Sequence, residues 1–520
     1  MGRRSKLGIF AALSLLAVAC GPAPDTGSGP AGSTGAGGSK GTASGGGGST
    51  SSLGPSDQGG GAVDATVAQT APGMTSGAGG AGVPGDLQGC PAEADRKTTV
   101  TTLTAPNPRL QSSVAETRAT LQAGKAPDPS AIRTAELLEY YAPSYDANPG
   151  PDPKLTVEMT TTPSGEYLFQ VGLTAPDHPA SRQALDLTVL VDTSSSMAGD
   201  SMARARSAVK TLALSLQKGD VVNLVATSPE IAPRTFPIQS SNDLNLIQAV
   251  NDLTTGGDGS LDRALDTAYQ LTLAKGSPDF KRLVLISDAG VAPADVDLGK
   301  VTAHQTNDGV AVVGLGVGPA IGYRSALLDA FAIAGRGAHL YLDDLDAGAV
   351  EGRVADSVLV RRFDGLFGAA ASGVTVTVAT PWFFTPHDEN DLHFATDSAV
   401  TTLPQYDIAY GQTLVFRQVL HPCAPAAPSV CKADFTVSAA WSGSDPQKAP
   451  SFTLAVGDIL TTSPRIAKAS AVVAFADALR SQDPGHLEAA YELASAIDGD
   501  ADMTEIAGLI QLHPLYPKGK

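Results

Sequence analysis

Basic residues are scarce in this chain. Lys and Arg total 35 against 53 Asp and Glu over 520 residues, and the formal net charge is −18. A nucleic-acid partner would need clustered Lys and Arg to neutralise its phosphates, so the charge balance argues against one. A cation, a basic ligand or solubility alone explains the acidic composition better.

The N-terminus contains an apolar run at residues 7–16. A membrane-spanning helix needs about 20 apolar residues, which excludes this run as a span. It follows the basic start MGRRSK and precedes small residues that end at Cys20, the pattern of an export signal. The position of Cys20 resembles the lipobox of bacterial lipoproteins. That resemblance implies lipidation of Cys20 and a membrane anchor on the periplasmic or surface side of a bacterial cell envelope.

Cysteine is rare, with only 4 in the chain. Export implies an oxidising compartment in which disulfides persist. Cys423 and Cys431 flank the loop CAPAAPSVC and predict a local disulfide, because no His or Cys pair nearby has a zinc-like spacing. Cys90 is left without an obvious partner, so it could be free or could join a second chain.

The composition divides the chain into segments. Residues 21–95 are mostly Gly, Ser, Ala, Thr and Pro and cannot bury a core, which predicts a flexible tether after a signal peptide at 1–20. Hydrophobic periodicity then predicts four folded parts. These are an α+β domain at 96–180 with a hairpin turn at 163–165, an α/β domain at 181–362, an antiparallel β domain at 363–462 and a helical segment at 463–520.

Residues 181–362 alternate apolar strands with amphipathic helices. This order predicts a doubly wound, mostly parallel sheet flanked by helices, and hence an α/β fold class. The run 185–191 is dense enough in Leu and Val for a strand buried on both faces, and it ends at Asp192, Ser194 and Ser196. Ligands of open parallel sheets bind beyond the carboxyl ends of the strands. Carboxylate and hydroxyl oxygens placed there suit a hard cation such as Mg2+.

Three motifs carry a family resemblance. The stretch DTSSS resembles the DxSxS loop of von Willebrand factor type A (vWA) domains. LVLISDAG, which contains Asp288, resembles a later strand of that fold, and GGDGSLDRALDTAY resembles the loop and helix between them. The flanking segments GKAPDPSAIRTAELLEYYAPSY and SPRIAKASAVVAFADALR resemble the terminal regions of a family of exported bacterial vWA proteins.

The resemblance implies a metal-ion-dependent adhesion site (MIDAS). Asp192, Ser194, Ser196 and Asp288 would hold Mg2+, or Mn2+ or Ca2+, and a protein partner would supply a carboxylate to the open position. One position departs from the family pattern: Gly259 stands where a threonine is usual. Asp258 or Ser260 beside it could supply the missing oxygen. Alternatively, the loop hydroxyls only cap the helices that follow them.

These observations lead to a hypothesis of a non-enzymatic, membrane-tethered lipoprotein that binds a protein partner through the metal. Two rivals remain open. One is a structural envelope or assembly scaffold with a degenerate metal loop. The other is a metal-assisted hydrolase, for which the sequence offers neither a second metal cluster nor an evident general base.

Overall fold

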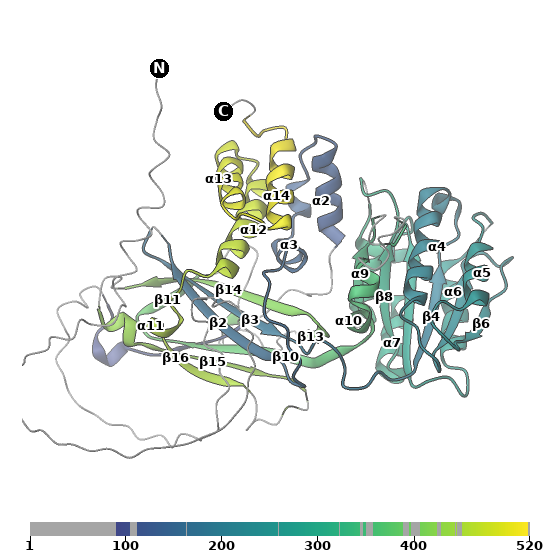
Figure 1. The fold of residues 1–520 in the computed structure, drawn as a ribbon, viewed down its shortest axis with the longest axis horizontal. Helices are drawn as coiled ribbons and strands as arrows, with labels where there is room; N and C mark the ends of the chain where they lie inside the picture. Colours follow the sequence, from purple (N-terminus) through teal and green to yellow (C-terminus); the bar gives the residue numbers. More distant parts are fainter. Residues whose placement is uncertain are drawn as a thin grey trace, which may run out of the picture.

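The computed structural model describes residues 90–103, 112–162, 164–257, 259–321, 323–343, 347–349, 357–387, 395–396, 406–423, 428–442, 444 and 450–517. Within them the chain forms an α/β domain, a β sandwich and a helical unit (Figure 1). The signal peptide, most of the tether, Cys20 and Asp258 lie outside the described residues. The predictions made for them stay predictions.

The α/β domain is built on one sheet with the strand order β6-β5-β4-β7-β8-β9. All neighbours pair in parallel except β6, an antiparallel edge strand that the periodicity did not predict. Every residue of the central strand β4 is buried, as its unbroken apolar run predicts. The predicted α/β fold class is confirmed. The strands are β4 (Leu185–Val191), β5 (Val221–Ala226), β6 (Arg234–Pro237), β7 (Phe280–Ser287), β8 (Ala311–Gly316) and β9 (Ala338–Tyr341).

Helices cover both faces of this sheet. One core contains residues of α4, α5, α9 and α10, and the other contains residues of α6, α7 and α8. Leu359 and Phe363 belong to the first core, so the domain runs slightly beyond the predicted boundary at 362. The helices are α4 (Asp200–Ala213), α5 (Leu244–Asn251), α6 (Leu261–Thr272), α7 (Leu298–Asp308), α8 (Ala326–Ala334), α9 (Val358–Arg361) and α10 (Phe363–Phe367).

The β sandwich takes strands from both sides of the α/β domain. One sheet has the order β12-β1-β10-β15-β16 with β13 also on β10, and the other has the order β11-β14-β3-β2. The strands are β1 (Thr99–Leu103), β2 (Lys154–Thr161), β3 (Tyr167–Thr174), β10 (Ala369–Thr380), β11 (Phe384–His387), β12 (Ala395–Thr396), β13 (Tyr406–Ala409), β14 (Thr413–Pro422), β15 (Asp434–Ala440) and β16 (Ser451–Ala455), and a short helix α11 (Val456–Ile459) follows.

The predicted hairpin of β2 and β3 is confirmed, but its assignment to a separate domain is wrong. β3 pairs antiparallel with β14, and β1 pairs antiparallel with β10. Phe169 stacks on Phe435 across the shared core, with ring centroids 5.0 Å apart. Residues 96–180 and 363–462 therefore contribute to one sandwich. The physical reason is that an isolated hairpin cannot bury enough apolar surface to be stable alone.

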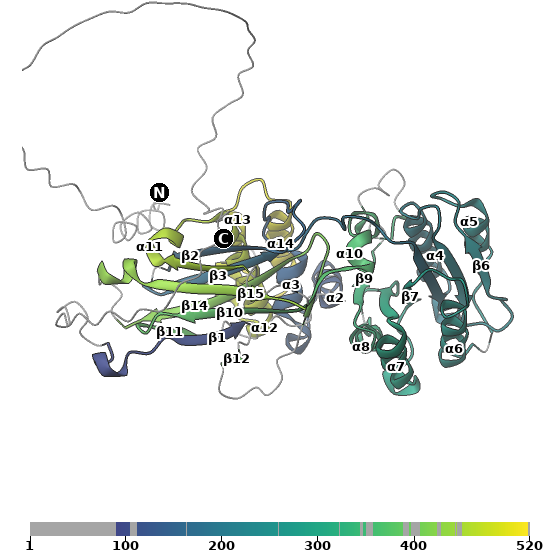
Figure 2. The ribbon, with the colours of Figure 1, turned by 90° about the horizontal axis from the view of Figure 1, so that it is seen from below.

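The helical unit likewise contains helices from before and after the α/β domain. It consists of α2 (Ser112–Gln122), α3 (Thr134–Tyr140), α12 (Pro464–Ser481), α13 (Pro484–Ser495) and α14 (Ala501–Leu512), which share one core. The helices at 463–520 are confirmed, but not as a separate segment. Figure 2 shows the α/β domain at one end of the sandwich. No helix among the described residues is long and apolar enough to cross a bilayer.

A disulfide joins two ends of the β sandwich. Cys423, directly after β14, is bonded to Cys90, with a Cα–Cα distance of 5.0 Å and a sequence separation of 333. The predicted Cys423–Cys431 bond is therefore wrong. The prediction relied on sequence proximity, whereas the pairing follows from tertiary structure that brings the residues before β1 next to the end of β14.

Candidate metal centre

Two of the predicted metal ligands, Asp192 and Asp288, lie at the ends of neighbouring strands. Val191 lies opposite Ile286 in the parallel pairing of β4 and β7. Asp192 and Asp288 each come directly after their strand, so both stand at the carboxyl edge of the sheet. This edge is where open α/β folds bind ligands.

Asp192 is held rigidly in this position. Its side chain is buried, with 5% of the residue exposed, and Oδ1 accepts the backbone N–H of Ser194 at 2.9 Å. Oδ2 accepts the hydroxyl of Ser287 at 2.7 Å. The Asp192 N–H donates to the carbonyl of Ile286 at 2.8 Å. A carboxylate fixed in this way suits a role as acceptor for metal-bound water, which Mg2+ keeps readily.

The hydroxyls of the two loop serines lie close to each other. The hydroxyl oxygens of Ser194 and Ser196 are 3.0 Å apart. A Cβ on Gly290 would stand 3.2 Å from Oδ1 of Asp288 and 3.6 Å from Oγ of Ser196, so these two oxygens flank one point. Adjacent ligands of an octahedral ion with bonds of about 2.1 Å are about 3.0 Å apart. The spacing of the serine oxygens therefore fits two neighbouring positions on Mg2+.

Ser287 ties the two halves of the centre together. It is fully buried, and besides donating to Asp192 it accepts the N–H of Ala289 at 3.0 Å. Ala289 has a positive φ of 59°, which turns the chain sharply after Asp288. Sequence reasoning missed Ser287. The available signal was a hydroxyl residue immediately before Asp288, at the end of a buried strand.

A second support lies on the opposite side of Asp192. The N–H of Thr193 donates to the hydroxyl of Thr227 at 2.9 Å, and the Thr193 hydroxyl accepts the N–H of Ser228 at 3.0 Å. These bonds fix the backbone of the serine loop to the end of β5. Thr193 and Thr227 were also missed, because buried hydroxyls give no periodic signal.

The position that departs from the family pattern has a steric explanation. A Cβ on Gly259 would lie 2.8 Å from the carbonyl oxygen of Thr227, closer than side chains approach backbone. Threonine cannot occupy this site without a shift of the loop. Ser260 is the N-cap of α6, and its hydroxyl accepts the N–H of Arg263 at 3.4 Å. This bond matches the alternative prediction that a loop hydroxyl caps a helix.

Among the described residues, the acidic side chains of the proposed centre are Asp192 and Asp288. Across the described part of the chain, no three or more His, Cys, Asp or Glu side chains form a group that could hold a metal. Asp192 and Asp288 are supplemented by serine hydroxyls instead. Two carboxylates with two serine hydroxyls form a donor set that suits one hard cation that keeps several waters.

A parallel sheet with one antiparallel edge, helices on both faces and a DxSxS loop at the carboxyl edge together define a vWA domain. The family model of the von Willebrand factor type A domain matches residues 186–343, so this part of the chain is a vWA domain. A curated relative, the uncharacterized protein YfbK of Escherichia coli (strain K12), is 26% identical over 251 residues. The match covers 45% of this chain and 43% of the relative, less than half of its length.

Solved structures with similar folds include two vWA proteins. The von Willebrand factor type A protein from Catenulispora acidiphila has a TM-score of 0.40 and 15% identity, over 71% of this chain and 91% of that chain. The ArnB paralog VWA2 from Sulfolobus acidocaldarius has a TM-score of 0.34 and 13% identity, over 70% of this chain and 96% of that chain.

Proposed function

We propose that this protein is tethered to the bacterial cell envelope and binds a protein partner through a divalent cation on its vWA domain. Asp192, Ser194, Ser196 and Asp288 hold the cation, with Mg2+ the favoured ion and Mn2+ or Ca2+ as alternatives. The vWA domain itself is a protein-interaction module. The metal, the partner and the anchor are the parts that this proposal adds.

The observation that carries the proposal is the spacing of the two serine hydroxyls. Ser194 Oγ and Ser196 Oγ lie 3.0 Å apart, and Ser196 is exposed. Asp192, at the start of the same loop, is fixed by hydrogen bonds to both carboxylate oxygens. A preorganised oxygen set with an exposed face leaves a cation free to accept one more ligand from outside. A carboxylate of a partner protein would fill that position.

The test is a pull-down of envelope proteins on the immobilised chain, with Mg2+ and with chelator. We expect a partner that binds with Mg2+, is lost with chelator, and is lost from Ser196→Ala. Ser195→Ala is the matched control because Ser195 is exposed in the same loop but is not among the proposed ligands. A partner retained under chelation and by Ser196→Ala would contradict metal-dependent binding.

The backbone of Thr227 leaves no room for a threonine side chain at position 259, so a usual ligand of the family is missing. This favours a second candidate, a structural scaffold with a degenerate metal loop. A scaffold would keep its partners in chelator, so the same pull-down separates the two functions. We propose a binding protein rather than an enzyme. Metal-dependent turnover of phosphate or ester probes, abolished in Asp288→Asn, would instead support the hydrolase.

The anchor follows from the export signal and Cys20, and from a tether that would hold the folded part away from a membrane. Mass spectrometry of the mature N-terminus tests it directly. We expect a lipid-modified Cys20 in the membrane fraction, and release of the protein from membranes in Cys20→Ser. An unmodified N-terminus would remove the lipoprotein assignment and leave the metal proposal unaffected.

A further inference from the structure

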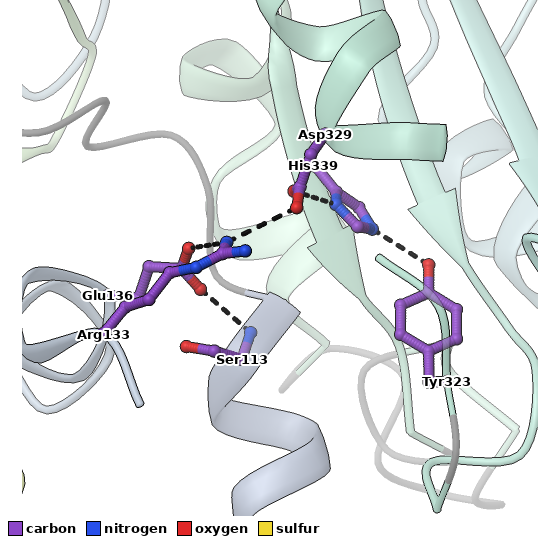
Figure 3. Close-up of polar contacts among 6 residues, drawn as sticks. All are labelled: Ser113, Arg133, Glu136, Tyr323, Asp329 and His339. Carbon is purple, nitrogen blue, oxygen red and sulfur yellow. Dashed lines mark hydrogen bonds and ion pairs between the residues drawn. The ribbon is translucent and has the colours of Figure 1, made fainter. Parts of the chain in front are cut away.

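A buried polar network lies beneath the edge of the vWA sheet next to the helical unit (Figure 3). His339 on β9 is fully buried, and its Nδ1 is 2.7 Å from Oδ1 of Asp329 on α8. Its Nε2 is 2.9 Å from the hydroxyl of Tyr323. Burial raises the pKa of Tyr323 well above its ordinary value, so the phenol stays protonated and can donate to Nε2. Nδ1–H then donates to Asp329, and both ring nitrogens are satisfied.

The network continues out of the vWA domain. Oδ2 of Asp329 accepts Nη1 of Arg133 at 3.4 Å, and Arg133 belongs to the N-terminus of α3 in the helical unit. The same Nη1 donates to Oε1 of Glu136 at 2.6 Å. Oε2 of Glu136 in turn accepts the N–H of Ser113 on α2 at 2.9 Å. The first turns of α2 and α3 therefore anchor the guanidinium that reaches Asp329.

At its other end the network reaches the metal centre. The ring of Tyr323 packs edge-on against Tyr341, with centroids 4.9 Å apart, and its hydroxyl occupies the space a side chain on Gly316 would need. Tyr341 donates to the carbonyl of Gly318 at 2.7 Å. A Cβ on Gly318 would stand 3.0 Å from both Cβ and the carbonyl oxygen of Asp288. The segment 316–318 is thus held between the two tyrosines and the Asp288 loop.

We propose that Arg133 is a positioning residue for the metal centre: through Asp329, His339 and Tyr323, the helical unit holds the loop that carries Asp288. The vWA domain of this chain is then not a self-sufficient module, because part of its metal-site support comes from α3. The inference rests on the proposed function for its effect on metal affinity. Its effect on the Asp288 loop stands independently of metal binding.

The structure offers a matched control for this contact. Arg336 pairs with Asp407 at 3.1 Å and links the vWA domain to β13 of the sandwich. The side chains of Arg133 and Arg336 are similarly exposed, at 45% and 49%, and those of Asp329 and Asp407 at 12% and 15%. Both pairs join the vWA domain to another unit. Asp329 also contacts His339, whereas no hydrogen bond connects Asp407 to His339 or Tyr323 among the described contacts.

The test compares Arg133→Met with Arg336→Met in the full chain by amide hydrogen exchange and Mn2+ calorimetry. We expect faster exchange at residues 289–291 in Arg133→Met only, and a Kd for Mn2+ raised about three- to tenfold, less than for loss of a direct support of a ligand. Tyr323→Phe removes the same support from inside the domain. It should produce the same changes, and the double variant should add little further.

Each outcome decides the inference. Unchanged exchange at 289–291 in Arg133→Met, or equal changes in both arginine variants, overturns it. A wild-type chain that gives no heat with Mn2+ overturns the metal-dependent function instead, and the exchange comparison still decides whether Arg133 holds the loop. Exchange that responds while Kd does not would limit the role of Arg133 to loop stability and overturn its role in metal positioning.

Discussion

The hydroxyl of Ser287 donates to Oδ2 of Asp192 at 2.7 Å, so the end of one strand fixes the carboxylate that begins the metal loop on its neighbour. The two residues are 95 positions apart in the sequence and adjacent at the sheet edge. Because Ser287 also accepts the N–H of Ala289, one buried hydroxyl orients both aspartates of the centre.

Ser287→Ala should therefore impair the centre without touching the metal. We expect a loss of metal affinity of about 10- to 100-fold, the range found for groups that orient metal ligands. Ser287→Thr keeps the hydroxyl and should restore most of the affinity. Calorimetric titration with Mn2+ measures both variants. Equal affinity of Ser287→Ala and the wild type would show that Ser287 does not orient the metal ligands.

Gly259→Thr should fail to complete the site. Its Cβ would press on the carbonyl of Thr227, and overpacking of this kind costs about 1–3 kcal/mol. Urea denaturation should show this loss, with no gain in Mn2+ affinity. Gly508→Ala in α14 is the control, since a Cβ there meets nothing within 4 Å, and it should leave stability equal or raise it by about 0.5–1 kcal/mol. A stable Gly259→Thr with tighter metal binding would contradict the steric explanation.

Glu139 should make stability depend on pH. Burial raises its pKa to about 7, although Arg362 and a hydrogen bond from Gln412 favour the charged form. The folded state therefore holds the proton more tightly than the unfolded state, whose pKa is near 4.5. Stability from this group is fully present below about pH 4.5 and is lost as pH rises through about 7, by up to about 3 kcal/mol.

Urea midpoints at pH 5, 6, 7 and 8 check this sign. We expect the wild type to be less stable at pH 8 than at pH 5, and Glu139→Gln to show a weaker dependence. Some slope should remain in the variant because burial also raises the pKa of Asp186, to about 6. Identical slopes in the two proteins would show that Glu139 does not titrate in this range.

The Cys90–Cys423 bond should appear in peptide mapping of the non-reduced protein. A linked pair of peptides containing these two cysteines is the expected product, and a Cys423–Cys431 peptide would contradict the structure. Because the bond closes a loop with a sequence separation of 333, its removal should lower stability by about 2–5 kcal/mol. Urea denaturation of the Cys90→Ser, Cys423→Ser double variant beside the wild type measures this change.

The sequence predicted those secondary-structure elements whose type depends on the residues nearby in the chain. The apolar run ending at Asp192 specified a buried central strand, and the alternation of strands and helices specified the parallel sheet. The pairing of β1 with β10 and of β3 with β14 was not predictable in this way, since periodicity shows which face of a strand is buried but not which strand lies beside it. The disulfide was predicted wrongly for the same reason, because the sequence does not show that Cys90 lies beside Cys423.

For the metal centre, the sequence predicted the ligands but not the residues that support them. Asp192, Ser194, Ser196 and Asp288 stand in motifs, and the structure places them at one sheet edge. Ser287 and Thr227 were missed because a buried hydroxyl resembles any other strand residue in the sequence. The contact between Arg133 and Asp329 joins residues 196 positions apart, and no spacing rule connects them.

The central claim, that the serine loop holds a divalent cation, is tested most directly by calorimetric titration of the purified chain with Mg2+ and Mn2+. We predict one saturable site in the wild type and in Ser195→Ala, and its loss in Ser196→Ala and Asp288→Asn. Absence of binding in the wild type, or binding that survives both ligand substitutions, would contradict it.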